Sequence, residues 1–290
     1  IRSCLVGSEM CIRDSFIERA PDEFAHAKYS AMRERSVGLG VMGLHSYFQK
    51  KNIPFGSVMS KVWNKKVFKN IQEKVDAASK SLAEERGACP DAEEYGMKER
   101  FSNKTAIAPT ASISIICGGS SPGIEPIAAN SYTHKTLSGS FNVRNKYLKK
   151  ILSKHKKDTD DVWSSITTNQ GSVSHLDFLT AEEKDTFKTA FEIDQRWIVE
   201  LGADRTPHIS QAQSINIFIP ADIHKKDLHN LHFQAWKKGL KSLYYCRSKS
   251  IQRAENVNKG TSTDVTKNVY SQGQESNNES NNYEECLSCQ

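Results

Sequence analysis

The sequence has 290 residues, of which 37% are hydrophobic and 26% charged, a composition ordinary for a globular protein with a buried core. Its formal net charge is +6 at pH 7, but the basic residues are scattered and no groove-reading or base-stacking motif accompanies them, which argues against a nucleic-acid-binding module. No apolar stretch approaches the roughly 20 residues that a membrane helix needs, and no secretory leader is recognisable. We therefore expect a cytoplasmic protein, not a membrane protein, with its seven cysteines reduced.

The chain divides by composition into three parts. Residues 1–15 show neither helical nor strand periodicity, and we expect a leader unrelated to the fold. Residues 16–250 have the patterning of a compact α/β body. Residues 251–290 are so polar that they cannot offset the entropy of ordering, so we expect a flexible tail.

Helical patterns dominate the first half of the body. The apolar run from Val37 predicts a helix to about Lys50, with its glycines explained by close helix packing. Apolar residues spaced three to five apart from Val58 to Leu82 predict a long amphipathic helix, which Gly87 and Pro90 end.

The second half alternates helices with short strands. Thr180-Ala-Glu-Glu183 has the form of a capping box and predicts a helix that continues to Gly202. Strand-like runs follow at Ser214–Ile219 and Ser242–Tyr245, separated by a predicted helix from Asp227 to Leu240. Alternation of this kind indicates the α/β class.

A first candidate site is the turn after Ala108, formed by Pro109, Thr110, Ala111, Ser112 and Ile113. Small hydroxyl residues after a proline can leave backbone N–H groups free at a helix start, which suits phosphate oxygens. A Ser/Thr-rich turn without a ligand explains the same residues equally well.

A second candidate is the adjacent pair Tyr244 and Tyr245. Neighbouring residues of a strand point to opposite faces, and such tyrosines are usually packing residues. Two phenols can also pass an electron and a proton stepwise.

The third candidate is the pair Cys286 and Cys289 near the end of the tail. A C-x-x-C pair can close to a disulfide and reopen by thiol exchange, whereas a zinc site would need further ligands that are not nearby. The tail from Asn256 to Cys286 would span about 30 Å as a coil, enough for a dithiol to move between a pocket and an external reductase. A small thiol oxidoreductase is an alternative, although Glu284 and Glu285 beside the pair oppose thiolate formation.

These three features, in this order, resemble the C-terminal part of the large (alpha) subunit of class I, aerobic, ribonucleoside-diphosphate reductase. The resemblance runs from about Phe16 to the last residue. The segments that carry it are Arg35–Gly43, Glu85–Pro90, Ala108–Ser114, Gly123–Pro126, Gln213–Asn216, Lys241–Tyr245 and the terminal cysteine pair.

The resemblance implies an α/β fold, the C-terminal half of the ten-stranded α/β barrel of ribonucleotide reductase, with a flexible tail. It implies an enzyme that reduces ribonucleoside diphosphates to deoxyribonucleotides for DNA synthesis by radical chemistry. Residues 109–113 would bind the substrate phosphates, and Tyr244 and Tyr245 would relay the radical. Cys286 and Cys289 would reduce the active-site disulfide after each turnover.

The resemblance also implies partners: a small (beta) subunit, thioredoxin or glutaredoxin, and a second copy of the full-length subunit. It implies no metal or cofactor bound in this chain, since the metal centre of the small subunit supplies the radical. The family's thiyl cysteine and its ATP/dATP effector sites have no counterpart in these residues, so we expect the chain alone to be inactive and prone to aggregation. Cys89, Cys117 and Cys246 would be buried small hydrophobes instead. A cobalamin-dependent reductase of the same superfamily is the alternative, but it does not need the tyrosine pair.

Overall fold

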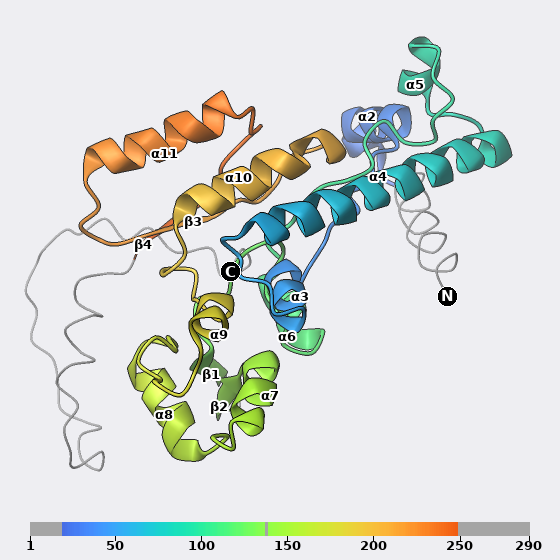
Figure 1. Ribbon diagram of the computed structural model, residues 1–290. Coiled ribbons are helices and arrows are strands. Elements are labelled where there is room, and N and C mark those ends of the chain that lie inside the picture. Colours follow the sequence, from blue (N-terminus) through green and yellow to red (C-terminus); the bar gives the residue numbers. More distant parts are fainter. Residues whose placement is uncertain (1–18, 137–138, 249–290) are drawn as a thin grey trace, which may run out of the picture.

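The computed structural model describes residues 19–136 and 139–248, so the leader 1–15 and the tail with Cys286 and Cys289 lie outside the described residues (Figure 1). The elements in chain order are η1 (Asp22–Phe24), α2 (Ala25–Glu34), α3 (Leu44–Lys50), α4 (Val58–Arg86), α5 (Pro90–Glu94), α6 (Ala111–Ile116), β1 (Ser131–Thr136), β2 (Gly139–Arg144), α7 (Lys146–Lys154), α8 (Asp160–Thr168), α9 (Ala181–Thr186), α10 (Gln195–Arg205), η2 (Thr206–His208), β3 (Ile217–Ile219), α11 (Lys225–Lys237) and β4 (Cys246–Ser248).

Four extended segments lie side by side and form a piece of parallel sheet. Leu39 bridges to Thr105, and Ile107 bridges to Gln213, both in parallel. The third segment continues into β3, which pairs in parallel with β4. Helices occupy each connection: α4 follows the first segment, α7 to α10 lie before the third, and α11 joins β3 to β4 (Figure 1). The α/β class predicted from the sequence is therefore confirmed.

The upper part of the molecule is a stack of helices in which α10 lies between α4 and α11 (Figure 1). Two faces of α10 are buried: Leu201 joins the core that contains Phe68 of α4, and Val199 joins a core with Leu231 of α11. The long helix α4 begins where the Ser57 hydroxyl accepts the N–H of Ser60 at 3.1 Å, and it ends at Gly87. The predicted amphipathic helix is confirmed.

A smaller lobe forms the lower part and contains the β1–β2 hairpin with α7, α8 and α9 (Figure 1). Its core is separate from that of the helical stack and is built on Trp163 and Phe187, each 1% exposed. The capping box predicted at Thr180 is present, because its hydroxyl accepts the Glu183 N–H while the Glu183 carboxylate accepts the Thr180 N–H.

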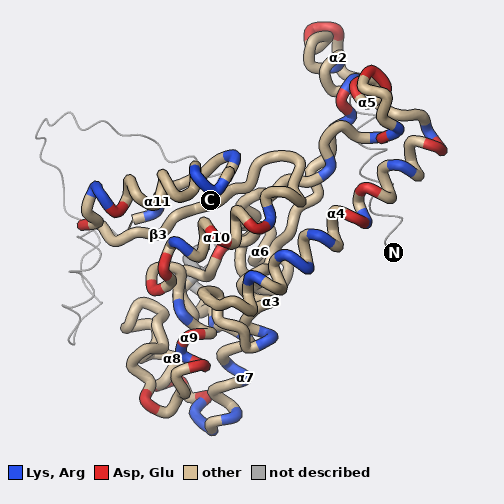
Figure 2. The backbone as a smooth tube through the Cα atoms, turned by 45° about the horizontal axis from the view of Figure 1, so that its top comes forward, with Lys and Arg blue, Asp and Glu red and all other residues tan. Residues whose placement is uncertain are grey.

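The charged residues are distributed over several helices. Figure 2 shows lysines and arginines along α4, α7 and α11, interleaved with acidic residues on α4. None of the described helices has the length and apolarity to cross a bilayer.

The helix predicted over Val37–Lys50 is wrong in its first half. Helix α3 begins only at Leu44, and residues 37–41 are extended against the 103–107 segment. A Cβ on Gly40 would lie 2.7 Å from the carbonyl oxygen of Ala106, and Gly43 has a φ of +81° where the chain turns into α3. These glycines therefore permit close approach of strands and a left-handed turn, not helix packing.

The single helix predicted from Thr180 to Gly202 is also wrong, because α9 stops at Thr186 and α10 starts at Gln195. Glu192 accepts the Thr189 N–H at 2.8 Å, and Ala190 donates its N–H to the carbonyl of Ile127 at 2.7 Å, so these donors are diverted from a helix ladder. Asp194 then caps α10 by accepting the Arg196 N–H.

The two predicted strands are shorter or displaced. Only Ile217–Ile219 of the first run is strand, and the second strand begins at Cys246, one residue after the tyrosine pair. The residues before them are still hydrogen-bonded across the gap, since Tyr244 donates its N–H to Ile215 at 2.8 Å. The helix predicted between them is confirmed, with α11 spanning Lys225–Lys237.

Candidate functional site

The turn at residues 109–113 begins helix α6 at the end of the 103–107 segment. Thr110 has a left-handed conformation, with φ 54° and ψ 32°, and precedes the first helical residue. Ser114 donates its N–H to the Thr110 carbonyl, so the N–H groups of Ala111, Ser112 and Ile113 belong to the first turn and have no partner within the helix. Ser112 and Ile113 are exposed, while the other three are half-buried. The turn presents a short row of backbone donors.

A second segment, Gly123–Pro126, holds this turn in place. Gly123 donates its N–H to the Thr110 hydroxyl at 2.7 Å. A Cβ on Gly123 would lie 2.9 Å from the carbonyl oxygen of Ala108, and its φ is +44°. Only glycine fits this close approach without displacing the turn, so the conformation of the turn depends on Gly123.

Tyr244 and Tyr245 do not point to opposite faces as expected for neighbours in a strand. Their ring centroids are 4.1 Å apart and the ring planes are inclined by 52°. The pair precedes β4, where the backbone has left regular strand geometry, and both residues are exposed, 43% and 44% respectively. The guanidinium of Arg247 lies over the Tyr245 ring, 6.0 Å from its centroid. The structure thus brings the two phenols into contact with each other and with solvent.

Hydrogen bonds and the backbone segment 123–125 together connect the tyrosine pair to the turn at Thr110. The Asn216 side-chain oxygen accepts the Tyr245 N–H at 2.9 Å, and its NH₂ group donates to Glu125 at 2.7 Å. Glu125 is two residues beyond Gly123, which is bonded to Thr110. Asn216 and Glu125 are 1% and 7% exposed, so water does not compete for these bonds. A buried polar link therefore joins the two candidate sites.

Burial raises the pKa of Glu125 to about 7, although the Asn216 hydrogen bond and the charge of Arg247 both favour its ionised form. Sequence reasoning missed Arg247 as a functional candidate, and it noted Glu125 and Asn216 only as parts of the family-like segments Gly123–Pro126 and Gln213–Asn216. The signal that could have found Glu125 is the glycine-bounded Gly123–Pro126 segment that accompanies the phosphate turn.

The cysteines expected to be buried differ among themselves. Cys89 is fully buried, as expected, but Cys117 and Cys246 are exposed, so the expectation is wrong for these two. Cys117 caps the end of the short helix α6, and Cys246 starts the edge strand β4, where no further element covers it within the described chain. No group of three or more His, Cys, Asp or Glu residues among residues 19–136 and 139–248 could hold a metal ion.

Two hollows flank these elements. One of about 360 Å³ lies between α3, α6 and the β1–β2 hairpin, next to Ala111 and Ser114. Three amide side chains of its wall are linked, since Asn145 donates to Gln49 at 3.0 Å and to Asn130 at 2.9 Å. The buried Ser120 hydroxyl, which also lines the hollow, has no hydrogen-bond partner among the described residues.

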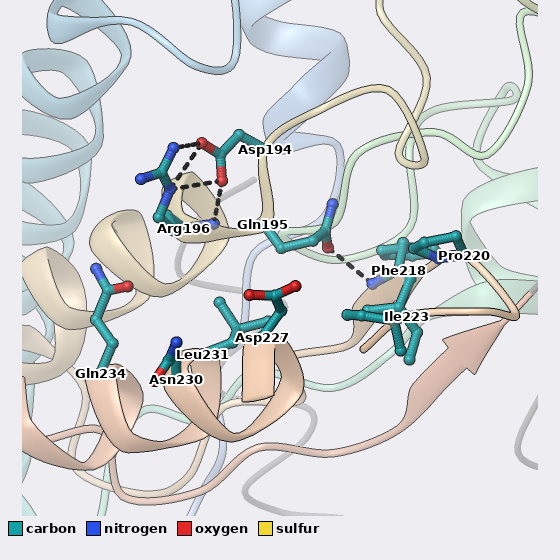
Figure 3. Close-up of a pocket in the computed structure, with 11 residues that line it drawn as sticks. Asp194, Gln195, Arg196, Phe218, Pro220, Ile223, Asp227, Asn230, Leu231 and Gln234 are labelled. Carbon is teal, nitrogen blue, oxygen red and sulfur yellow. Dashed lines mark hydrogen bonds and ion pairs between the residues drawn. The ribbon is translucent and has the colours of Figure 1, made fainter. Parts of the chain in front are cut away.

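The other hollow, of about 390 Å³, lies between the start of α10, the end of β3 and α11 (Figure 3). Its one basic lining residue, Arg196, is paired with Asp194, and this contact lowers the pKa of Asp194. Figure 3 shows Gln195 turned to the backbone of Phe218, whose N–H it accepts at 2.7 Å. With Arg196 already neutralised, the hollow does not suit a phosphate.

Comparison with known proteins decides the family. The model of the family described as "Ribonucleotide reductase, barrel domain" matches residues 7–100 and 90–246. The chain is 48% identical over 246 residues to the ribonucleoside-diphosphate reductase large subunit of Invertebrate iridescent virus 6, covering 83% of this chain and 25% of that protein. The corresponding protein of Invertebrate iridescent virus 3 is 43% identical over 251 residues, covering 86% of this chain and 40% of that protein.

The chain belongs to the ribonucleotide reductase barrel-domain family. A solved structure, the Actinobacillus ureae class Id ribonucleotide reductase alpha subunit, matches with a TM-score of 0.77 and 39% identity, covering 83% of this chain and 44% of that chain. The chain therefore has part of the barrel fold that its sequence predicts, and it is similar to this class Id alpha subunit. It spans 25% and 40% of the two viral large subunits.

The structure brings together four of the parts named above: the turn at 109–113, Gly123–Pro126, Asn216 and the tyrosine pair. Parallel register explains this, because Ile107 is level with Gln213 and Ile215 accepts the N–H of Tyr244. Ligand sites of parallel α/β sheets lie at the carboxyl ends of their strands, where the turn at Pro109 begins. The terminal dithiol lies outside the described residues, and its role stays a prediction.

Proposed function

We propose that this chain supplies the phosphate-binding turn, the tyrosine relay and the terminal dithiol of a class I ribonucleoside-diphosphate reductase large subunit. The observation that carries the proposal is the link from Thr110 to Tyr245, in which hydrogen bonds to Gly123, Glu125 and Asn216 are connected by the short backbone segment 123–125. Membership of the reductase family gives this link its chemical context. The remainder of the active site, including the thiyl cysteine, would come from parts of the barrel that these residues do not contain.

The turn at residues 109–113 would bind the substrate diphosphate through its backbone donors and hydroxyl groups. Phosphate oxygens accept strong hydrogen bonds from N–H groups at a helix start, even without a basic side chain in contact. The Thr110 hydroxyl accepts the Gly123 N–H, so its own proton can be directed to the ligand. This arrangement would fix the phosphates and thereby orient the ribose toward the rest of the active site.

Tyr244 and Tyr245 would pass the oxidising equivalent inward. Rings 4.1 Å apart are close enough for the two phenols to exchange an electron and a proton directly. Arg247 beside the Tyr245 ring disfavours a cationic phenol radical, so the proton should leave together with the electron. The exposure of both rings leaves them accessible to a small subunit, whose metal centre would supply the oxidant.

Cys286 and Cys289 would reduce the active-site disulfide after turnover and would be regenerated by thioredoxin or glutaredoxin. Such a dithiol needs a long tether, and the polar composition of the segment from Asn256 onward supports that role. The complete subunit would act in the cytoplasm as a homodimer, with ATP/dATP effector sites in its other domains. This chain by itself would have no reductase activity.

Reconstitution tests the proposal. The chain, joined to the upstream part of a large subunit and mixed with the small subunit, should form deoxyribonucleotides from ribonucleoside diphosphates. Changing Tyr244 or Tyr245 to Phe should abolish turnover, while Tyr95→Phe, at a residue 79% exposed on another face, should not. Substantial turnover by either relay variant would contradict the relay.

A second arm tests the tail. Cys286→Ser should stop turnover driven by thioredoxin but spare turnover driven by a small dithiol such as dithiothreitol. Equal loss with both reductants would give the cysteine pair another role.

A further inference from the structure

Asn216 links two groups by the two ends of one amide. Its oxygen accepts the N–H of Tyr245 at 2.9 Å, and its nitrogen donates to the Glu125 carboxylate at 2.7 Å. Both residues of the link are buried, and both bonds join segments that are distant in sequence. One planar amide therefore joins the Glu125 carboxylate to the backbone of Tyr245.

Glu125 is in turn fixed to the phosphate turn. Its N–H donates to the Pro122 carbonyl at 3.0 Å, and Gly123 between them donates to Thr110 at 2.7 Å. On its other side the N–H of Ile127 donates to His45 of α3 at 3.0 Å. The carboxylate thus lies between the turn that would hold substrate phosphates and the pair that would carry the radical.

We propose that Glu125 is a positioning residue for the tyrosine pair, holding Tyr245 through Asn216 and coupling it to the state of the Thr110 turn. The inference rests on the proposed function, since it assigns the link a role in the same reaction. It adds a residue outside both the turn and the relay, and it makes the strength of the Asn216 bond depend on the charge of one buried carboxyl group.

The physical reason is the difference between the two forms of the carboxyl group. A hydrogen bond to an ionised carboxylate is roughly twice as strong as one to a neutral acceptor. A stronger bond at the Asn216 nitrogen polarises the amide, so its oxygen becomes a better acceptor for the Tyr245 N–H. Because burial raises the pKa of Glu125 to about 7, both forms are populated near neutral pH.

Among residues 19–136 and 139–248, Arg247 on β4 is the charged group that favours ionisation of this carboxyl group. His45 on α3 is bonded to the neighbouring Ile127, but burial lowers its pKa to about 3, so it stays neutral over the same range. A titration near pH 7 at Tyr245 would therefore report Glu125.

The chain contains a matched internal control at Tyr147. Its N–H also donates to an asparagine oxygen, that of Asn145, at 3.0 Å. The Asn145 nitrogen, however, donates to the neutral amides of Gln49 and Asn130 instead of a carboxylate. The two sites thus differ in what accepts the hydrogen bond from the asparagine nitrogen, which is a carboxylate for Asn216 and neutral amides for Asn145.

The experiment is NMR on the full 290-residue chain labelled with ¹⁵N-tyrosine, with Tyr245 assigned by Tyr245→Phe. We expect the Tyr245 amide-proton resonance to move with pH about a midpoint near 7, and the Tyr147 resonance to stay in place. The near-isosteric Glu125→Gln should abolish the movement. Arg247→Gln, at an exposed position, should shift the midpoint to higher pH by removing the cation. Inorganic pyrophosphate should also move the wild-type Tyr245 resonance, and less so in Glu125→Gln.

A Tyr245 resonance that does not titrate, or that titrates equally in Glu125→Gln, would overturn the proposal. In the reconstituted reductase, Glu125→Gln should lower kcat about tenfold, the effect of one weakened hydrogen bond, with KM unchanged. A raised KM with unchanged kcat would contradict the positioning of the relay. Absence of turnover in the wild-type reconstitution would instead count against the proposed function. The titration of the Tyr245 resonance would still test whether Glu125 acts on Tyr245 through Asn216.

Discussion

His45 should make the fold sensitive to acid. The imidazole is fully buried on α3, where Nδ1 accepts the Ile127 N–H at 3.0 Å and the ring lies edge-on to Phe55 with centroids 5.3 Å apart. Burial lowers its pKa to about 3. The folded protein therefore keeps a neutral ring, whereas the unfolded chain binds a proton at mildly acidic pH.

The size of the effect follows from the two pKa values. In the unfolded chain the imidazole titrates near 6.5, so its contribution to stability is fully present above that pH. It is lost as the pH falls toward 3, because only the unfolded state can take up the proton. At pH 5.5 the loss is about 1.4 kcal/mol relative to pH 8.

Glu125 changes stability in the opposite direction. Its pKa is raised from 4.5 to about 7, so its contribution is fully present below pH 4.5 and is lost as the pH rises through 7. The pH profile of the wild-type chain therefore contains both effects. A variant that removes only His45 leaves the Glu125 contribution unchanged, and the difference between the two proteins isolates the histidine.

His45→Asn is the suitable change, since the asparagine oxygen can still accept the Ile127 N–H but cannot titrate. We expect the variant to be about 2–3 kcal/mol less stable at pH 8 because of lost ring packing. In urea unfolding at pH 5.5 and 8, the difference in unfolding free energy between the wild type and the variant should be about 1.4 kcal/mol smaller at the lower pH. His229→Asn, on the exposed surface of α11, serves as the control. An equal difference in unfolding free energy at both pH values would show that the His45 ring does not stay neutral in the folded protein.

Three further changes test the packing. Arg205→Ala should lower the unfolding free energy by about 3–5 kcal/mol in urea titrations, because Arg205 is 1% exposed and bonded to side-chain amides. Arg196→Ala, at an exposed position of the same helix, should lower it far less, and similar losses in the two variants would contradict the buried network. Gly40→Ala should lower the unfolding free energy by about 1–3 kcal/mol, because the added Cβ would lie 2.7 Å from the Ala106 carbonyl oxygen. Gly38→Ala should lower it less, because its nearest contact is a side chain at 3.2 Å. The reverse order of the two variants in thermal unfolding would contradict the pairing of residues 37–41 with residues 103–107. Ile116 is an apolar residue that is 82% exposed, so Ile116→Lys should reduce concentration-dependent light scattering by the isolated chain. Unchanged scattering would show that the chain associates through a different surface.

Patterns among residues close in the sequence were sufficient to predict elements that depend only on such neighbours. The spacing of apolar residues predicts α4, and the Thr180 capping box predicts the start of α9. The same patterns gave the wrong prediction where backbone N–H groups form hydrogen bonds outside a helix. Glu192 and the Ile127 carbonyl divert the N–H groups that a continuous helix after Thr186 would need.

The sequence by itself determined the chemistry available: a small-residue turn at Pro109, two adjacent phenols and a terminal cysteine pair, in the order found in one enzyme family. Only the tertiary structure decided that the phenols contact each other and that Glu125 and Asn216, 91 residues apart, join them to the turn. Periodicity reports neighbours within a few residues along the chain. The level of one parallel strand against another is set by the packing of the helices between them, and no local pattern contains that information.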